Sequence, residues 1–305
     1  MSLLVVGSVG LDTVYTPFDK REDALGGSAT YISLTSSYFT GPIHFVGVVG
    51  EDFPVEYIKL LESRNIDLEG LQIIKGGKTF RWAAKYHYDL NVRDTLLTEL
   101  NVFESFNPII PKKFQKAQFV CLGNIDPTLQ LRVLEQLDKP KFVVCDTMNY
   151  WIEGKKKELL ELIKKVNVLI VNDSEARLLA QEPNLIKSAK IIRGLGPEIL
   201  IIKKGEHGAL LFVEDQIFSA PAYPLEMIFD PTGAGDSFAG GFTGYLHRTQ
   251  DLGAENMKCA VVYGSTMASF CVEKFSTKGL EDLDYLRVKD RFREFHNLSK
   301  FNENE

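Results

Sequence analysis

The chain has 305 residues, of which 45% are hydrophobic and 25% are charged, so it is long enough to bury a substantial core. Its formal net charge of −6 leaves no basic stripe of the kind that follows the phosphates of a nucleic acid. Nucleic acid is therefore not expected as a partner.

The cysteines and the first residues of the chain indicate the cellular compartment in which the protein is expected. Cys121, Cys145, Cys259 and Cys271 lie mostly inside apolar runs and form no CxxC pair, so neither a zinc site nor a disulfide framework is expected. The first residues lack the basic region of a secretory signal, and no apolar run approaches the ~20 residues that span a bilayer. These features predict a soluble, cytoplasmic protein with free thiols and no membrane partner.

Short apolar runs rich in Val, Ile and Leu recur along the chain. They are continuous rather than alternating, which is typical of strands buried on both faces of a parallel sheet. The runs cover residues 3–6, 45–49, 119–122, 142–145, 168–171 and 199–202. Helical spacing lies between many of them, at residues 55–61, 129–137, 159–166 and 176–179. This alternation predicts an α/β protein, a three-layer αβα sandwich around a mostly parallel central sheet.

Residues 70–100 interrupt this rhythm. Phe80, Trp82, Ala84, Tyr86 and Tyr88 alternate with other side chains, and this period of two indicates a strand with one apolar and one polar face. Such a strand does not suit a sheet covered on both faces. We expect a small separate β-sheet formed by about residues 13–25 and 70–100, and a surface hairpin without function is the alternative.

The last third of the chain completes the expected domain. Residues 209–213 and 216–220 flank an acidic turn and predict a hairpin that closes the main sheet. Helical spacing follows at residues 238–246, 254–270 and 283–295. Because no repeat or low-complexity linker divides the chain, residues 1–305 are expected to form a single domain with the small sheet attached.

The most informative segment is Asp-Pro-Thr-Gly-Ala-Gly-Asp-Ser-Phe-Ala-Gly-Gly-Phe, residues 230–242. A turn of small residues that opens a helix leaves several backbone N–H groups unpaired, and the helix dipole adds partial positive charge at the same place. Gly233 and Gly235 let the backbone approach a phosphate closely. In the first turn, the Asp236 carboxylate can accept the proton of an attacking hydroxyl. The alternative is that Asp236 only caps the helix and the glycines only allow close packing.

This segment resembles the C-terminal motif of the PfkB (ribokinase-like) family of carbohydrate and nucleoside kinases, in which Asp-Thr-x-Gly-Ala-Gly-Asp-x-Phe provides the anion hole and the catalytic Asp. The resemblance implies an ATP-dependent kinase with a ribokinase-like fold, in which the small β-sheet is a lid. It also implies that Asp236 is the catalytic base and that Gly233, Ala234 and Gly235 hold the γ-phosphoryl group.

Other segments match the same family in the same order, so the resemblance covers nearly the whole chain. Gly26 and Gly27 resemble the N-terminal di-glycine, a hinge that lies against the substrate and lets the lid close. Asp12 matches the acidic residue that commonly binds substrate hydroxyls. These matches imply an acceptor site between the main sheet and the lid.

Further matches imply how the nucleotide is held. Asn172 and Glu175 resemble the Asn-x-x-Glu motif that organises phosphate and magnesium, with Glu175 acting on Mg²⁺ through water. A helix cap formed by the same pair is the alternative, and both roles can coexist. Lys203 and Gly205 lie in a segment similar to the strand and turn that support the nucleotide, although a solvated basic turn also fits Lys203.

The loop before the anion hole resembles a cation site. Asp230 and Thr232 correspond to positions that hold a monovalent cation in many family members, with the loop at residues 272–279 completing the site. The resemblance thus implies ATP and Mg²⁺ as cofactors, with K⁺ as a further candidate.

Two positions depart from the family pattern. Tyr31 stands where ribokinases often have Asn, which leaves the identity of the substrate open. The family's Asp-x-Asn-x-Arg pattern is matched only loosely by residues 146–151, which contain Asn149 but no Arg. Tyr31 and Asn149 are both candidate substrate contacts.

Several functions remain in competition. A sugar or sugar-like acceptor is the first expectation, and an adenosine-type nucleoside is the alternative, because the aromatic residues Trp82, Tyr86, Tyr88 and Tyr31 can stack on a nucleobase. A catalytically silent sugar sensor and a dinucleotide-binding oxidoreductase are weaker alternatives, the second because the glycines after the first strand give only an incomplete GxGxxG. An open lid sheet also presents edges that invite pairing, so a homodimer through the lid is a further hypothesis.

Overall fold

The main sheet is built from the predicted apolar runs. The computed structural model describes residues 2–300, and within this range nine strands form one sheet in the order β13-β12-β11-β10-β9-β8-β1-β4-β5. The strands from β11 to β5 are parallel, whereas β12 and β13 form an antiparallel hairpin at one edge. The strands are β1 (Leu3–Val6), β4 (Ile43–Gly50), β5 (Ile66–Ile74), β8 (Phe119–Leu122), β9 (Phe142–Asp146), β10 (Val168–Asn172), β11 (Ile199–Lys203), β12 (Ala209–Val213) and β13 (Gln216–Ala220).

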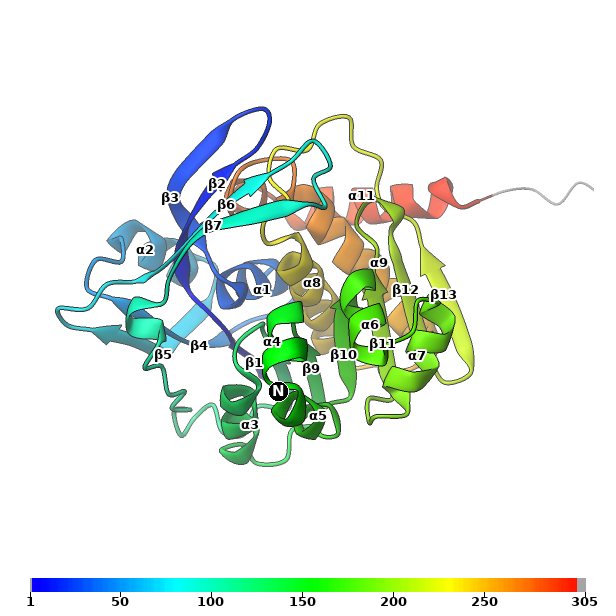
Figure 1. Cartoon of the computed structure of the whole chain (residues 1–305), viewed down its shortest axis with the longest axis horizontal. Helices are drawn as coiled ribbons and strands as arrows, with labels where there is room; N and C mark the ends of the chain where they lie inside the picture. Colours follow the sequence, from blue (N-terminus) through cyan, green and yellow to red (C-terminus); the bar gives the residue numbers. More distant parts are fainter. Residues whose placement is uncertain (1, 301–305) are drawn as a thin grey trace, which may run out of the picture.

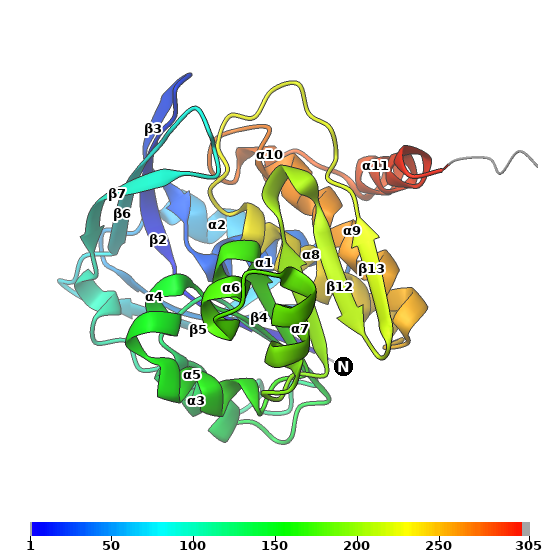
Figure 2. The same ribbon diagram turned by 45° about the vertical axis from the view of Figure 1, so that its right-hand side comes forward.

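Each central strand contributes to two cores, because successive side chains point to opposite faces of a sheet. Leu3 and Val5 belong to one hydrophobic cluster, and Leu4 and Val6 belong to a second one. Helices contribute many of the other residues in both clusters, and a helical layer covers each face of the sheet (Figures 1 and 2). The predicted three-layer αβα sandwich is confirmed.

The helices fall into two layers and a C-terminal pair. The first cluster receives side chains from α1 (Ser28–Ser36), α2 (Val55–Ser63), α8 (Ala234–Thr249) and α9 (Ala254–Cys271). The second receives them from α3 (Pro127–Glu135), α4 (Asn149–Gly154), α5 (Lys156–Ile163), α6 (Asp173–Ala180) and α7 (Leu185–Arg193). The chain continues through α10 (Lys278–Glu281) and α11 (Tyr285–Leu298), which contact α9. No helix within residues 2–300 is long and apolar enough to cross a bilayer.

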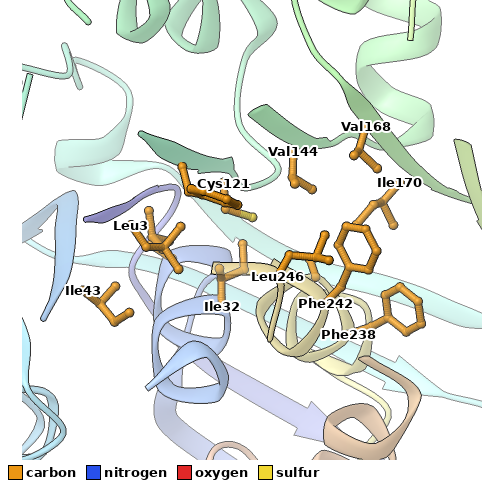
Figure 3. Close-up of a cluster of buried hydrophobic side chains, with 14 of the residues drawn as sticks. Leu3, Ile32, Ile43, Cys121, Val144, Val168, Ile170, Phe238, Phe242 and Leu246 are labelled. Atoms are coloured by element: carbon orange, nitrogen blue, oxygen red, sulfur yellow. The ribbon is translucent and has the colours of Figure 1, made fainter. Parts of the chain in front are cut away.

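The core beneath the sheet fixes the position of α8. Phe238, Phe242 and Leu246 recur at helical spacing and are at most 4% exposed. They extend from α8 toward the strand residues Val144 and Ile170 (Figure 3). Burying one such side chain stabilises the fold by about 1.5–3 kcal/mol. Helix α8 is therefore anchored to the sheet along most of its length.

A separate four-stranded sheet forms the lid, in the order β3-β2-β6-β7 (Figure 1). Its strands are β2 (Gly10–Tyr15), β3 (Lys20–Gly26), β6 (Phe80–Tyr86) and β7 (Arg93–Glu99). Central β2 pairs parallel with β6 and antiparallel with β3, and β7 pairs antiparallel with β6. The period of two in residues 80–86 correctly predicts β6.

The boundaries of the lid differ from the predicted ones. The lid sheet begins at Gly10 rather than at residue 13, and residues 70–74 belong to β5, the edge strand of the main sheet. As an edge strand β5 is only half-buried, so it lacks the continuous apolar run that identifies its neighbours. Tyr88 lies beyond the end of β6 and is 86% exposed, so it does not extend the apolar face of that strand.

Candidate active site

Three polar residues meet at the edge of the main sheet because three parallel strands end there. Asp146, Asn172 and Lys203 are the last residues of β9, β10 and β11, which are neighbours in the sheet. Asn172 is directly opposite Lys203 in the strand register. Lys203 Nζ lies 3.6 Å from Asp146 Oδ1, and both side chains are largely buried. Crevices at the carboxyl ends of parallel strands are the usual ligand sites of open α/β sheets.

The start of α8 faces the same edge and presents free backbone donors. Gly233 has a φ of +77° and turns the chain into the helix. Ala234 N–H donates to Pro231 O at 3.2 Å, and Ser237 N–H donates to Gly233 O at 2.8 Å. Within residues 2–300, no acceptor is bonded to the N–H groups of Gly235 and Asp236. With the helix dipole, these groups form a site for an anion.

The two glycines at this turn allow close packing of the site. A Cβ atom on Gly235 would lie 2.7 Å from Lys203 Nζ, so the ammonium group adjoins the free N–H groups. A Cβ atom on Gly233 would lie 2.4 Å from the Tyr31 ring. The arrangement combines a cation, backbone donors and the carboxyl group of Asp236, which is the equipment that phosphoryl transfer requires.

Asp236 is half-buried, and its carboxyl group has a raised pKa. Burial raises the pKa of Asp236 to about 7, and the nearby Asp146 carboxylate adds to the rise, while the charges of Lys203 and Arg93 oppose it. A carboxyl group with a pKa near the working pH is suited to act as a general base.

Asn172 and Glu175 form the predicted helix cap at the start of α6. Asn172 Oδ1 accepts a hydrogen bond from Glu175 N–H at 2.8 Å, and Glu175 Oε2 accepts one from Asn172 N–H at 2.7 Å. Glu175 is buried, and desolvation raises its pKa to about 7 although Lys203 opposes the shift. The cap thus holds a carboxyl group close to Lys203.

The di-glycine and Asp12 lie together on the lid side of the site. Gly27 has a φ of +94°, and a Cβ atom there would lie 2.4 Å from Ser8 O. A Cβ atom on Gly26 would lie 2.0 Å from Asp12 Oδ2, so only glycine leaves room for that carboxyl group. Burial raises the pKa of Asp12 to about 8, and the Asp230 and Asp236 charges add to the rise.

Asp230 links two loops next to the anion site. Its carboxylate accepts hydrogen bonds from Thr232 N–H at 2.8 Å and from Ser276 N–H at 3.0 Å. Asp230 is 1% exposed, and desolvation raises its pKa. Asp230 is therefore hydrogen-bonded to the loop at residues 272–279.

Two predicted substrate contacts lie elsewhere than expected. Tyr31 is 1% exposed and packs in a core cluster with residues such as Phe39 and Met267, so its ring supports Gly233 from behind and offers no face for stacking. Asn149 is exposed at the start of α4, and within residues 2–300 its side chain makes no hydrogen bond to the site.

The sequence interpretation also missed two charged residues that shift the pKa of Asp236. Asp146 directly follows the apolar run at residues 142–145, and its place at the end of a predicted parallel strand was the available signal. Arg93 begins β7 of the lid, and its neighbouring sequence gives no comparable signal.

Comparison with known proteins decides the family. The sequence model of the pfkB family carbohydrate kinases matches residues 17–282. The chain belongs to this family. A cytidine kinase of Thermococcus kodakarensis is 32% identical over 257 residues, which cover 83% of this chain and 91% of that protein. A nucleoside kinase of Methanothermobacter thermautotrophicus is 26% identical over 306 residues, covering 90% of this chain and 91% of the relative.

Solved structures share the fold of this pfkB kinase. The nucleoside kinase of Burkholderia thailandensis, solved with inosine, superposes with a TM-score of 0.78 at 19% identity and covers 97% of this chain and 99% of that chain. An E. coli protein classed as a ribokinase II, solved with ATP and Mg²⁺, gives a TM-score of 0.79 at 15% identity. The match covers 96% of this chain and 99% of that chain. The present protein is accordingly an ATP-dependent phosphotransferase that uses an alcohol group as acceptor.

The lid of this pfkB kinase contacts two loops that border the site, the loop before α8 and the turn after β11. Tyr86 Oη of β6 lies 3.1 Å from Thr232 Oγ1, next to the anion site. At the turn between β6 and β7, Asn91 Oδ1 lies 2.4 Å from where a Cβ atom of Gly205 would be. Gly205, with a φ of +55°, is thus the point where the turn of the lid meets the predicted nucleotide loop.

The residues present suit ATP with Mg²⁺. No group of three His, Cys, Asp or Glu side chains in the described part of the chain forms a metal cage. Mg²⁺ is usually held by one or two carboxylates, substrate phosphates and water, so a dedicated cage is not needed. Asp146 and Glu175 offer two carboxyl groups beside the anion site, which is the donor set that such an ion requires.

Proposed function

We propose that the acceptor of this kinase is a nucleoside, phosphorylated on its primary hydroxyl. The cytidine kinase and the nucleoside kinase described above are similar to this chain over most of its length. Trp82 and Asp12 are direct neighbours across β6 and β2, so an indole ring and a carboxyl group border the same space. An indole face suits stacking on a base, and a carboxyl group suits hydrogen bonds to ribose hydroxyls.

The proposed phosphoryl transfer rests on one observation above all, the half-buried Asp236 beside the free N–H groups of α8. In this account Asp236 takes the proton of the acceptor hydroxyl while that oxygen attacks the γ-phosphorus. The bond from phosphorus to the β–γ bridging oxygen breaks, and ADP leaves with that oxygen. Gly233, Ala234 and Gly235 hold the γ-phosphoryl oxygens through backbone donors.

The remaining residues bind and orient the substrates. Lys203 compensates phosphate charge, and Gly205 supports the nucleotide. Asp12, Gly26 and Gly27 line the acceptor. Asn172 holds Glu175 in place, and Glu175 with Asp146 would hold Mg²⁺ through water. When bound, Mg²⁺ supplies positive charge that offsets the charge of the phosphates.

The acceptor test is a panel that compares nucleosides with free sugars. ADP release from ATP and Mg²⁺ is measured with cytidine, uridine, adenosine, inosine, ribose and sugar acids, and the product is identified by mass and by ³¹P NMR. We expect a nucleoside to be the best acceptor, with a phosphate on its primary hydroxyl and a kcat/KM at least about tenfold above that of ribose. A free sugar as the best acceptor would contradict the proposal.

The proposal extends to a monovalent cation near Asp230. The buried carboxylate already joins Thr232 to Ser276, and a cation such as K⁺ beside it would lower the charge next to the anion site. Turnover in K⁺ buffer above that in tetramethylammonium buffer of equal ionic strength supports this role, and equal turnover contradicts it.

The lid is also proposed as the contact of a homodimer. Strand β7 is an edge of the lid sheet and is exposed along its whole length, and it includes Leu96, which is 55% exposed, and Leu97, which is 46% exposed. Open edges of this kind favour pairing with a second strand. Sedimentation that shows only monomer at micromolar concentration would remove this part of the proposal.

A further inference from the structure

The main sheet leaves the catalytic centre with a shortage of positive charge. Three carboxyl groups, of Asp146, Glu175 and Asp236, surround one ammonium group, that of Lys203. Lys203 is already engaged by Asp146 at 3.6 Å. The turn after β9, residues 146–151, contains neither Lys nor Arg. A bound nucleoside triphosphate adds several negative charges, so a further cation from outside the main sheet would stabilise the reacting group.

Arg93 is the cation that the lid brings to this place. It is opposite Tyr86 in the register of β6 and β7, and paired residues point to the same face of a sheet. Tyr86 Oη lies 3.1 Å from Thr232 Oγ1 at the anion site. The Arg93 guanidinium carbon lies 5.4 Å from the centre of the Trp82 ring, which is on that same face. Arg93 is therefore a solvent-exposed residue on the same face of the lid sheet as Trp82 and Tyr86, the face whose Tyr86 contacts the anion site.

The guanidinium group of Arg93 has no carboxylate of its own. Within residues 2–300 it takes part in no salt bridge, whereas Arg81 of the same hairpin is paired with Asp23 and Asp52. Its charge reaches the catalytic carboxyl group: burial and Asp146 raise the pKa of Asp236, and Lys203 and Arg93 lower it. The same holds for the pKa of Glu175, which desolvation raises most and which Lys203 and Arg93 lower.

We propose that Arg93 is a catalytic residue that the lid supplies, binding the γ-phosphoryl oxygens when the lid covers the site. A planar guanidinium group can donate two parallel hydrogen bonds to these oxygens. It would neutralise charge as the bond from the acceptor oxygen to phosphorus forms and the bond to the ADP oxygen breaks, while Asp236 holds the acceptor proton. The proposal deepens the proposed function and rests on it.

A cation on the lid couples acceptor binding to catalysis. Gly26 and Gly27 join the lid to α1, and Asp12 of the lid borders the proposed acceptor space. An acceptor that holds the lid down would also hold Arg93 at the phosphate. Without acceptor, the Arg93 guanidinium group is seldom at the γ-phosphoryl group when a water molecule reaches it, so ATP hydrolysis should be slow.

The test compares Arg93→Ala and Arg93→Lys with Lys85→Ala. Lys85 is an exposed cation on the opposite face of β6, so its removal changes the charge of the lid but not the site. We expect Arg93→Ala to lower kcat by about 10²–10³ with an unchanged melting temperature, and Lys85→Ala to stay within about threefold of the parent. Arg93→Lys should fall between, because it keeps the charge but loses the fork of donors.

Chemical rescue separates a contact with phosphate from a structural role. Free guanidinium at millimolar concentration should raise the kcat of Arg93→Ala at least about tenfold above its value without guanidinium. It should leave the kcat of the parent and of Lys85→Ala unchanged. A kcat of Arg93→Ala within about threefold of the parent would overturn the proposal, as would an equal loss in Lys85→Ala or a loss without rescue. Turnover of the parent with a nucleoside as acceptor in the same assay tests the proposed function separately, so the two failures are distinguishable.

Discussion

At the scale of single residues, the position of Asp236 determines both its reactivity and its cost to the fold. The first turn of α8 places the carboxyl group beside free N–H donors but also beside the Asp146 carboxylate. Burial and this neighbour raise the pKa of Asp236 to about 7. The group is therefore half-ionised near neutral pH in the free enzyme.

The raised pKa of Asp236 predicts the pH dependence of catalysis. Because a base must be unprotonated, kcat/KM should rise about tenfold per unit as pH increases toward 7 and should level above it. Burial also raises the pKa of Glu175 to about 7, so the profile is measured again in Glu175→Gln. The acid limb should persist in that variant. A limb that disappears there would assign the titration to Glu175 instead.

Gly233 is the residue whose conformation the anion site needs most. Its φ of +77° disfavours other residues, and a Cβ atom would meet the Tyr31 ring at 2.4 Å. Gly233→Ala should lower the free energy of unfolding by about 2–4 kcal/mol and remove most of the activity. Gly154→Ala is the matched control, since a Cβ atom there has no neighbour within 4 Å. Chemical denaturation that finds both variants equally stable would contradict this role.

At the scale of elements, the cap of α6 combines a structural role with a proposed catalytic one. Asn172 and Glu175 satisfy each other's backbone N–H groups at the start of the helix. The carboxyl group that completes the cap also adjoins Lys203. Two substitutions can separate these roles, because glutamine keeps the geometry of the cap but not the charge.

We therefore predict that Asn172→Ala affects stability, whereas Glu175→Gln affects the Mg²⁺ requirement. The first should lose about 1 kcal/mol of stability, because the N-cap acceptor is removed. The second should lose no stability, because it removes a carboxyl group whose pKa burial raises, but it should raise the Mg²⁺ concentration needed for half-maximal turnover. Denaturation and a Mg²⁺ titration measure the two effects. An unchanged Mg²⁺ requirement in Glu175→Gln would restrict the pair to capping.

Tyr86 connects the lid to the loop that precedes the anion site. Tyr86→Phe removes the hydroxyl that lies 3.1 Å from Thr232 Oγ1 and keeps the buried ring. One such hydrogen bond contributes about 0.5–1.5 kcal/mol, so KM for the acceptor should rise about two- to tenfold at an unchanged melting temperature. Tyr88→Phe is the control, because Tyr88 is 86% exposed. Equal KM values for the two variants would contradict the role of Tyr86.

Helices could be predicted from the sequence where one face is apolar and the other polar, and strands could be predicted where a short run of residues is wholly apolar. Amphipathic α2 and α5 and the continuous strands of the main sheet gave clear patterns. Helix α1 was not predicted from the sequence. Every one of its residues is buried, so its sequence has no polar face that would mark it as an amphipathic helix. Strand β5 was assigned to the lid instead of the main sheet, because its half-exposed residues lack a continuous apolar run and resemble those of a lid strand.

At the scale of the whole molecule, the parallel order of the strands assembles the site. Asp146, Asn172 and Lys203 are separated by more than twenty residues along the chain, yet they end adjacent strands. The motif around Asp236 could be found in the sequence because its residues are contiguous. Arg93 could not, because it reaches the site only through the pairing of β6 with β7 and the position of the lid over α8.

The most direct test of the account is the rate of phosphoryl transfer by Asp236→Asn in a single turnover with the best acceptor. We predict a loss of about 10²–10⁴ in the transfer rate with ATP affinity retained. The variant should melt no lower than the parent at pH 8. The pKa of Asp236 is about 7 in the folded protein and 3.8 ordinarily, so ionisation of this group destabilises the parent as pH rises between these values, and asparagine removes that effect. A transfer rate within about threefold of the parent would contradict Asp236 as the base.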